Sequence, residues 1–295
     1  MANLKEIKIK IGSVSNTQKT TKAMKLVSSA KLTRTRQLSD QAKSYAIKMN
    51  DVLSEIASRV SSVQDEENIN KAFRPCENPK TVDIVFVTAD KGLCGGFNMA
   101  TIKTVTNLKA EYEAKGVNVR LRASGRKGSD YFSFQRINLE QSTVDLSAAP
   151  DYDKACNFIE QSVKDFNEGL TDKVILVYNG FLNMLTQEIK VRELLPVSLD
   201  NVSINENVTS MLEIEPDDDD EVLVELTGKY IDFNMYYALI DSLAAEHSAR
   251  MQAMEAATKN AKEKVDLLTI EYNKARQAAI TTELIEIISG VESLK

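Results

Sequence analysis

The 295-residue chain is 43% hydrophobic and 27% charged, with a formal net charge of −6, which excludes an intrinsically disordered protein and allows a buried core. Its three cysteines and single histidine are too few for a disulfide framework or a Cys/His metal site. No segment approaches the roughly 20 consecutive apolar residues of a membrane-spanning helix, and the N-terminus lacks the apolar region of a signal peptide. We therefore expect a reduced, cytosolic protein.

Residues 1–74 are expected to form an N-terminal coiled-coil helix. Apolar residues recur at helical spacing on both sides of a polar band at residues 15–22. Residues 1–36 carry nine Lys or Arg side chains against Glu6 alone. A basic segment on an acidic protein favours a negatively charged partner, although a solvated helix face explains it equally well.

Residues 75–208 are expected to form a central Rossmann-like α/β domain. All five prolines and eight of the eleven glycines lie between residues 75 and 216, so only the flanks can be long uninterrupted helices. The expected strands and helices of the middle alternate, which predicts βαβ units. The strands are expected at residues 82–88, 117–121 and 173–178, and the helices at residues 98–115 and 152–167.

The loop after the first expected strand is the main candidate for a phosphate site. Residues 92–96, Gly-Leu-Cys-Gly-Gly, match neither G-x-G-x-x-G nor the P-loop pattern, so a tight, closely packed turn is favoured over nucleotide binding. Cys94 could be a nucleophile only with His247 as its base, and His247 falls on the seam of the C-terminal helix, where packing is expected. The sequence therefore predicts no catalytic residue, no cofactor site and no metal site.

Residues 209–295 are expected to form the C-terminal coiled-coil helix, opened by the acidic run at 217–221, where carboxylates favour the helix N-terminus. From Leu223 to Ala279 the apolar residues alternate steps of three and four, which is the coiled-coil repeat. A helix over residues 221–289 would be about 100 Å long and needs a partner along its stripe. Because both flanks are rooted in the same middle domain, the two helices are expected to pair antiparallel.

This pairing predicts an unpaired C-terminal tip. With residues near 60 opposite residues near 215, the N-terminus reaches only about residue 274, and roughly the last 20 residues project. The pairs Leu284-Ile285 and Ile287-Ile288 spread apolar area around more than one helix face. A lone helix in water would not tolerate this surface, so another chain must supply a socket.

Three segments together resemble one family, the γ subunit of F-type ATP synthase. They read IGSVSNTQKTTKAMKLV at residues 11–27, DKGLCGGFN at residues 90–98, and EHSARM, AATKNA, YNKARQAAIT and EIISG between residues 246 and 290. Their order and spacing match across the whole chain. Two positions depart from the family pattern: Thr20 replaces an apolar residue, and the aspartate run at 217–220 is longer and more acidic.

The resemblance implies a central rotor shaft that couples ion-driven rotation of a c-ring to ATP synthesis or hydrolysis at the β subunits, without a catalytic site of its own. The coiled coil would lie inside a ring of three α and three β subunits. The α/β domain would pack with the ε subunit, and the foot would sit on the c-ring. The implied location is peripheral, on the cytoplasmic side of a bacterial inner membrane, with no cofactor and no nucleic-acid partner.

The resemblance also assigns contact residues. Arg276 and Gln277 match the pair that contacts a catch loop of β, and Met24 and Lys25 match the neck near the acidic lever of β. The full expected surface for the catch loop and the bearing comprises Arg276, Gln277, Ile280, Thr281, Leu284 and Ile288. The segment expected to meet the c-ring contains Met211, Leu212 and Ile214.

Two other functions are compatible with single features of the sequence. An enzyme would need a phosphate site within residues 80–200, and its isolated chain would bind ATP. A coiled-coil arm for nucleic acid would bind DNA or RNA through residues 1–36 with strong salt sensitivity. Neither function explains an apolar tip that needs a socket.

Overall fold

The computed structural model describes residues 4–63, 71–74, 76–197 and 219–292. The chain divides into two compact units: residues 1–29 with residues 250–295, here the coil unit, and residues 30–249, here the sheet unit. The two long helices contribute to both units. In chain order the elements are α1 (Leu4–Val63), the 3-10 turn η1 (Lys71–Phe73), β1 (Thr81–Val87), α2 (Phe97–Ala114), β2 (Asn118–Ser124), α3 (Arg126–Phe134), β3 (Gln141–Thr143), α4 (Tyr152–Asn167), β4 (Lys173–Phe181), β5 (Gln187–Leu195) and α5 (Asp219–Glu292).

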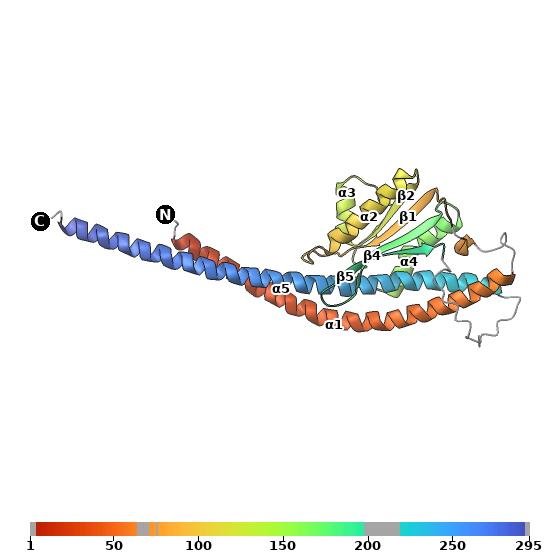
Figure 1. The fold of residues 1–295 in the computed structure, drawn as a ribbon, viewed down its shortest axis with the longest axis horizontal. Coiled ribbons are helices and arrows are strands. Elements are labelled where there is room, and N and C mark those ends of the chain that lie inside the picture. The colour runs from red at the N-terminus through yellow and green to blue at the C-terminus, as the bar shows by residue number, and fades with distance from the viewer. Residues whose placement is uncertain (1–3, 64–70, 75, 198–218, 293–295) are drawn as a thin grey trace. The chain divides into compact units, whose positions relative to one another are not determined.

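The sheet has the strand order β3-β2-β1-β4-β5. Strands β1 to β4 pair in parallel, whereas β5 pairs antiparallel to β4 and forms an edge. Helices α2 and α3 cover one face, and α4 and α5 cover the other (Figure 1). The predicted fold class, an α/β sheet combined with long antiparallel N- and C-terminal helices, is confirmed. Elements α3, β3 and β5 were not predicted.

Strand β1 is buried on both faces, as its apolar run predicts for a central parallel strand. Val82, Ile84 and Phe86 pack into the core beneath α2 and α3. Val85 and Val87 point to the opposite core, which is shared with α4 and α5. The period-2 alternation of a strand thus links two separate cores through one element.

The sheet-unit part of α5 is buried on nearly all sides between Tyr237 and Ala249. The neighbouring helices, the sheet and the loop after β1 all pack against this stretch. Its alanines, including Ala238, Ala244 and Ala245, have little side chain and let these elements approach the helix backbone closely.

In the coil unit, α1 and α5 run antiparallel. The hydroxyl of Thr258 donates to the hydroxyl of Thr21 at 2.7 Å, and Lys25 pairs with Glu255 at 2.7 Å. In an antiparallel pair, each residue toward the start of α1 corresponds to one residue further along α5. Extended from these two contacts, Leu4 lies opposite a residue close to Arg276. The described part of α1 therefore reaches about this position of α5.

Candidate interaction sites

The glycine loop after β1 is a packing loop. In an open α/β sheet, a ligand crevice forms at the carboxyl ends of the strands where the chain reverses its direction of winding, which here lies between β1 and β4. Cys94 and Phe97 of the loop, with Phe181 at the end of β4, pack in this place against Ala245 and Ala249 of α5. Helix α5 thus packs directly against the loop, which agrees with the preference for close packing.

Cys94 is placed as a structural thiol. It is 2% exposed, and its sulfur accepts a hydrogen bond from the Asn98 amide at 3.3 Å. A reactive cysteine needs access and an electropositive setting, whereas this one faces the loop and α5. His247 is likewise buried, on α5. Among the described residues, no group of three or more His, Cys, Asp or Glu side chains could hold a metal ion.

The sheet unit contains a buried network of two arginines and two aspartates that sequence reasoning missed. Arg122 donates to Asp83 at 2.8 Å and also to Asp165 of α4, and Arg120 pairs with both carboxylates. Asp83 is fully buried, and burial raises its pKa despite the hydrogen bond from Arg122. Burial alone would also raise the pKa of Asp165, but hydrogen bonds from Arg120 and Gln161 and the charges of both arginines hold it below its usual range.

This network serves structure rather than chemistry. Asp83 lies on β1, Arg120 and Arg122 on β2, and Asp165 on α4, so the four charges join the helix to the two strands. Each charge is matched by an opposite one; Asp83, Arg122 and Asp165 are buried, and the Arg120 side chain is 16% exposed. The signals in the sequence that could have indicated it were Asp83 inside the apolar run of β1 and the two alternating arginines of β2.

The neck residues lie on α1 in the coil unit. Met24 is half-buried, and the ammonium of Lys25 pairs with Glu255 across the coil. Leu26 and Val27, the next two residues, are 63% and 57% exposed. Lys25 of the basic N-terminal segment is thus paired within the chain, and an apolar surface lies beside it.

The Lys25–Glu255 pair is expected to add little to stability. Their side chains are 34% and 61% exposed, and ion pairs in such positions contribute about 0–1 kcal/mol. Replacing Glu255→Gln should change the free energy of unfolding of the chain by less than about 1 kcal/mol, measured by urea titration. Lys22→Gln, at an exposed position one turn away, is the matched control, and a much larger loss in the Glu255 variant would contradict the expectation.

The C-terminal part of α5 exposes the predicted apolar side chains. Ile287 and Ile288 are 63% and 62% exposed, although isoleucine is among the residues most often buried in proteins. Arg276 and Gln277 are also exposed, and the hydroxyl of Thr281 donates to the Gln277 carbonyl within the helix. The exposed large apolar residues of this segment are Ile280, Leu284, Ile285, Ile287, Ile288 and Val291.

The structure thus brings the six residues expected at the catch loop and the bearing together on one helix, separate in sequence from the neck. Met211, Leu212 and Ile214 lie outside the described residues, as do Asp217 and Asp218 of the acidic run. Within the described part of the chain, no helix is long and apolar enough to cross a membrane.

Comparison with known proteins identifies relatives along the entire chain. A family model described as ATP synthase matches residues 3–294. The ATP synthase gamma chain of Aliarcobacter butzleri (strain RM4018) is 77% identical over 296 residues, covering 100% of both chains. The ATP synthase gamma chain of Sulfurovum sp. (strain NBC37-1) is 57% identical over 295 residues, again with 100% coverage of both.

Solved structures show the same fold at low sequence identity. A chain from the central stalk and c-ring of Tetrahymena thermophila mitochondrial ATP synthase is 23% identical, with a TM-score of 0.58 over 80% of this chain and 98% of that chain. A chain from the rotor of Euglena gracilis mitochondrial ATP synthase is 15% identical, with a TM-score of 0.53 over 88% of this chain and 99% of that chain. The resemblance inferred from the sequence motifs is confirmed.

Proposed function

Since the chain belongs to the family of ATP synthase gamma chains, we propose that it is the central rotor shaft of an F-type ATP synthase. It couples rotation of an ion-driven c-ring to ATP synthesis or hydrolysis at the β subunits and carries no catalytic site of its own. Its partners are the α3β3 ring, the ε subunit and the c-ring. The complex is membrane-associated, and we place this subunit on the cytoplasmic side of a bacterial inner membrane.

The observation that carries this proposal is the exposed apolar segment at the end of α5. The described part of α1 begins at Leu4, yet exposed large aliphatic side chains of α5 continue past the point opposite Leu4 to Val291. Full burial of each such side chain is worth about 1.5–3 kcal/mol. An external apolar socket would recover this free energy, and the bearing at the top of an α3β3 ring is such a socket.

The polar residues just before this segment suit a directional contact. Arg276 presents a planar guanidinium that can form paired hydrogen bonds with a carboxylate, and Gln277 adds an amide at the next position. We propose that both contact a catch loop of β, while Ile280, Thr281, Leu284 and Ile288 line the bearing contact.

The neck is proposed to act differently. Met24, with Leu26 and Val27 nearby, presents apolar surface. We propose that Lys25, which pairs with Glu255 in the isolated chain, lies close to the acidic lever of β. Each angle of the shaft would stabilise a different conformation of the three β subunits, so rotation shifts their populations in turn. The foot on the c-ring, with Met211, Leu212 and Ile214, belongs to the same proposal.

Native mass spectrometry of complexes isolated through a tag on this chain tests the proposal. The expected result is one copy of the chain with three copies each of two nucleotide-binding subunits. Recovery of a homodimer, or of a single chain carrying nucleic acid, would overturn the shaft function. A tag on the N-terminus is preferable, because a C-terminal tag would interfere with the bearing contact.

A further inference from the structure

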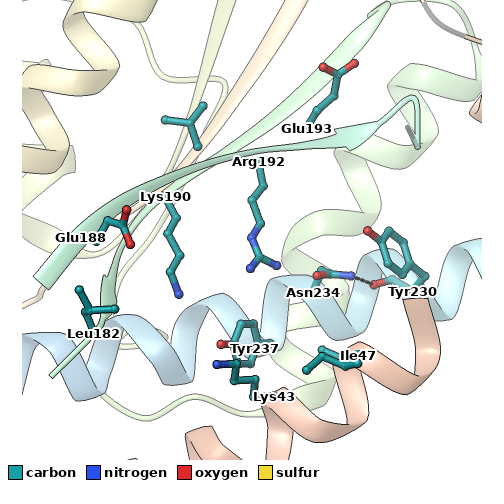
Figure 2. A pocket seen from close by; sticks show the side chains of 12 residues that line it. Lys43, Ile47, Leu182, Glu188, Lys190, Arg192, Glu193, Tyr230, Asn234 and Tyr237 are labelled. Atoms are coloured by element: carbon teal, nitrogen blue, oxygen red, sulfur yellow. Dashed lines mark hydrogen bonds between the residues drawn. The ribbon is translucent and has the colours of Figure 1, made fainter. Parts of the chain in front are cut away.

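A cavity of about 740 Å³ lies in the sheet unit between α1, β5 and α5. Lys43 and Ile47 reach it from α1, while Tyr230, Asn234 and Tyr237 reach it from α5 (Figure 2). This volume is within the range of small-molecule sites, roughly 300–1,000 Å³. None of the functions assigned above uses it.

Several hydrogen-bond donors line the cavity. Lys190 and Arg192 lie two residues apart on β5, so they share one face of the strand, and both extend from β5 toward α5 (Figure 2). The guanidinium of Arg192 lies 5.8 Å from the ring centroid of Tyr237. Glu193 also lines the cavity, but its carboxylate pairs with Lys173 at 2.7 Å.

Two of the three cations retain free donors. Lys190 already has a partner within the chain. Its ammonium pairs with the buried carboxylate of Asp241 at 2.7 Å and lies over the rings of Tyr178 and Tyr237. The side chains of Arg192 and Lys43 form no ion pair with any carboxylate among the described residues. Only Glu188 among the lining side chains offers an opposing charge without a described ion pair.

The tyrosine hydroxyls add neutral donors. Burial, together with the negative charge of Asp241, raises the pKa of Tyr237 to about 12 despite the opposing charge of Arg192. Burial likewise raises the pKa of Tyr230. Both phenols therefore keep their protons at neutral pH and can donate to an anion.

Edge protection explains only part of this arrangement. β5 is an edge strand, and charged residues on edges prevent pairing with other chains. That purpose needs only a charge in solvent, whereas Arg192, although exposed, also extends toward α5 and lies over the ring of Tyr237 (Figure 2). A planar guanidinium with unused donors inside a cavity matches the geometry of an oxyanion.

We propose that this cavity binds an oxyanion of the phosphate class. Arg192 and Lys43 supply the charged hydrogen bonds, and the Tyr237 hydroxyl supplies a neutral one. The Lys190–Asp241 pair holds the base of the cavity in place. The proposal is independent of the shaft function, because it concerns a ligand of the sheet unit and not a subunit contact.

Isothermal titration of the full chain with pyrophosphate tests the proposal. We expect saturable binding at one site per chain, weakened at least about tenfold by Arg192→Gln because a charge-assisted pair is lost. Tyr237→Phe, which keeps the ring, should weaken binding by a smaller factor. Arg126→Gln, at an exposed arginine of α3 outside the cavity, is the matched control and should leave binding unchanged.

Further titrations identify the source of the phosphate group. Tighter binding of ATP than of pyrophosphate, with the same dependence on Arg192, supports a nucleotide as the ligand, and equal binding supports a simple phosphate. Equal weakening by Arg192→Gln and Arg126→Gln would overturn the proposal, because it would reflect general surface charge. Binding of a glutamate-rich peptide through Arg192 without binding of pyrophosphate would also overturn it and make the cavity a protein-docking site.

Discussion

Asp165→Asn is expected to destabilise the sheet unit by about 3–5 kcal/mol, because removing one member of a buried ion network leaves its partners uncompensated. The substitution preserves the shape of the side chain but leaves Arg120 and Arg122 facing Asp83 alone. Two arginine charges would then share one buried carboxylate. The cost is the exclusion of those charges from water rather than the loss of one attractive contact.

Equilibrium urea unfolding measures this effect. The chain has nine tyrosines and no tryptophan, and tyrosine fluorescence reports on the sheet unit because several of these rings lie in its core. Glu160→Gln is the control, since Glu160 pairs with Lys164 on the solvent face of the same helix. Its urea midpoint should stay close to that of the unmodified chain. Equal midpoints for the two variants would show that the network contributes nothing to stability.

The pH dependence provides a second readout of the same residue. The pKa of Asp165 is lower in the folded chain than its ordinary value of 3.8, so the stability that it contributes is present above that value and is lost as the pH falls through the folded-state pKa. The difference in stability between the unmodified chain and Asp165→Asn should therefore be constant near neutral pH and shrink below about pH 4. A difference that grew on acidification would have the wrong sign.

The helices and the central strands could be predicted because each depends on local periodicity. The apolar run of β1 and the three-four alternation of α5 appear directly in the sequence. The missed elements carry weaker signals. α3 contains Gly128, β3 has only three residues, and β5 mixes charged and apolar side chains because it lies at an edge.

The two polar centres could not be predicted for a different reason. The ion network joins β1, β2 and α4, and the cavity joins α1, β5 and α5. Their residues come from distant segments, so only the packing of these segments brings them together. Arg192 read alone is one more charged residue on a surface strand. The contact residues expected at the C-terminal end stay a prediction; the motif that implies them could be read from the sequence because it lies on one helix.

Deleting residues 285–295 is expected to speed release of the chain from an α3β3 assembly by at least about tenfold, which corresponds to 1.4 kcal/mol. The deletion removes Ile285, Ile287, Ile288 and Val291, all exposed in the chain itself. Burial of a single such side chain in a socket is worth about 1.5–3 kcal/mol. The expected minimum therefore requires only one of the four to be buried in the bearing.

Folding of the chain should be nearly unaffected by the same deletion. The removed residues make no buried contact among those described, so the urea midpoint of the shortened chain should match that of the full-length chain.

A full-length variant with Ile285→Ser, Ile287→Ser and Ile288→Ser separates loss of apolar contact from loss of helix length. Val224→Ser, at an exposed apolar position near the other end of α5, is its control. If retention and folding fell together, the segment would be packing within the chain, and the argument for an external socket would fail. If retention alone fell, the free energy that holds the shaft would come from the side chains that the isolated chain leaves in water.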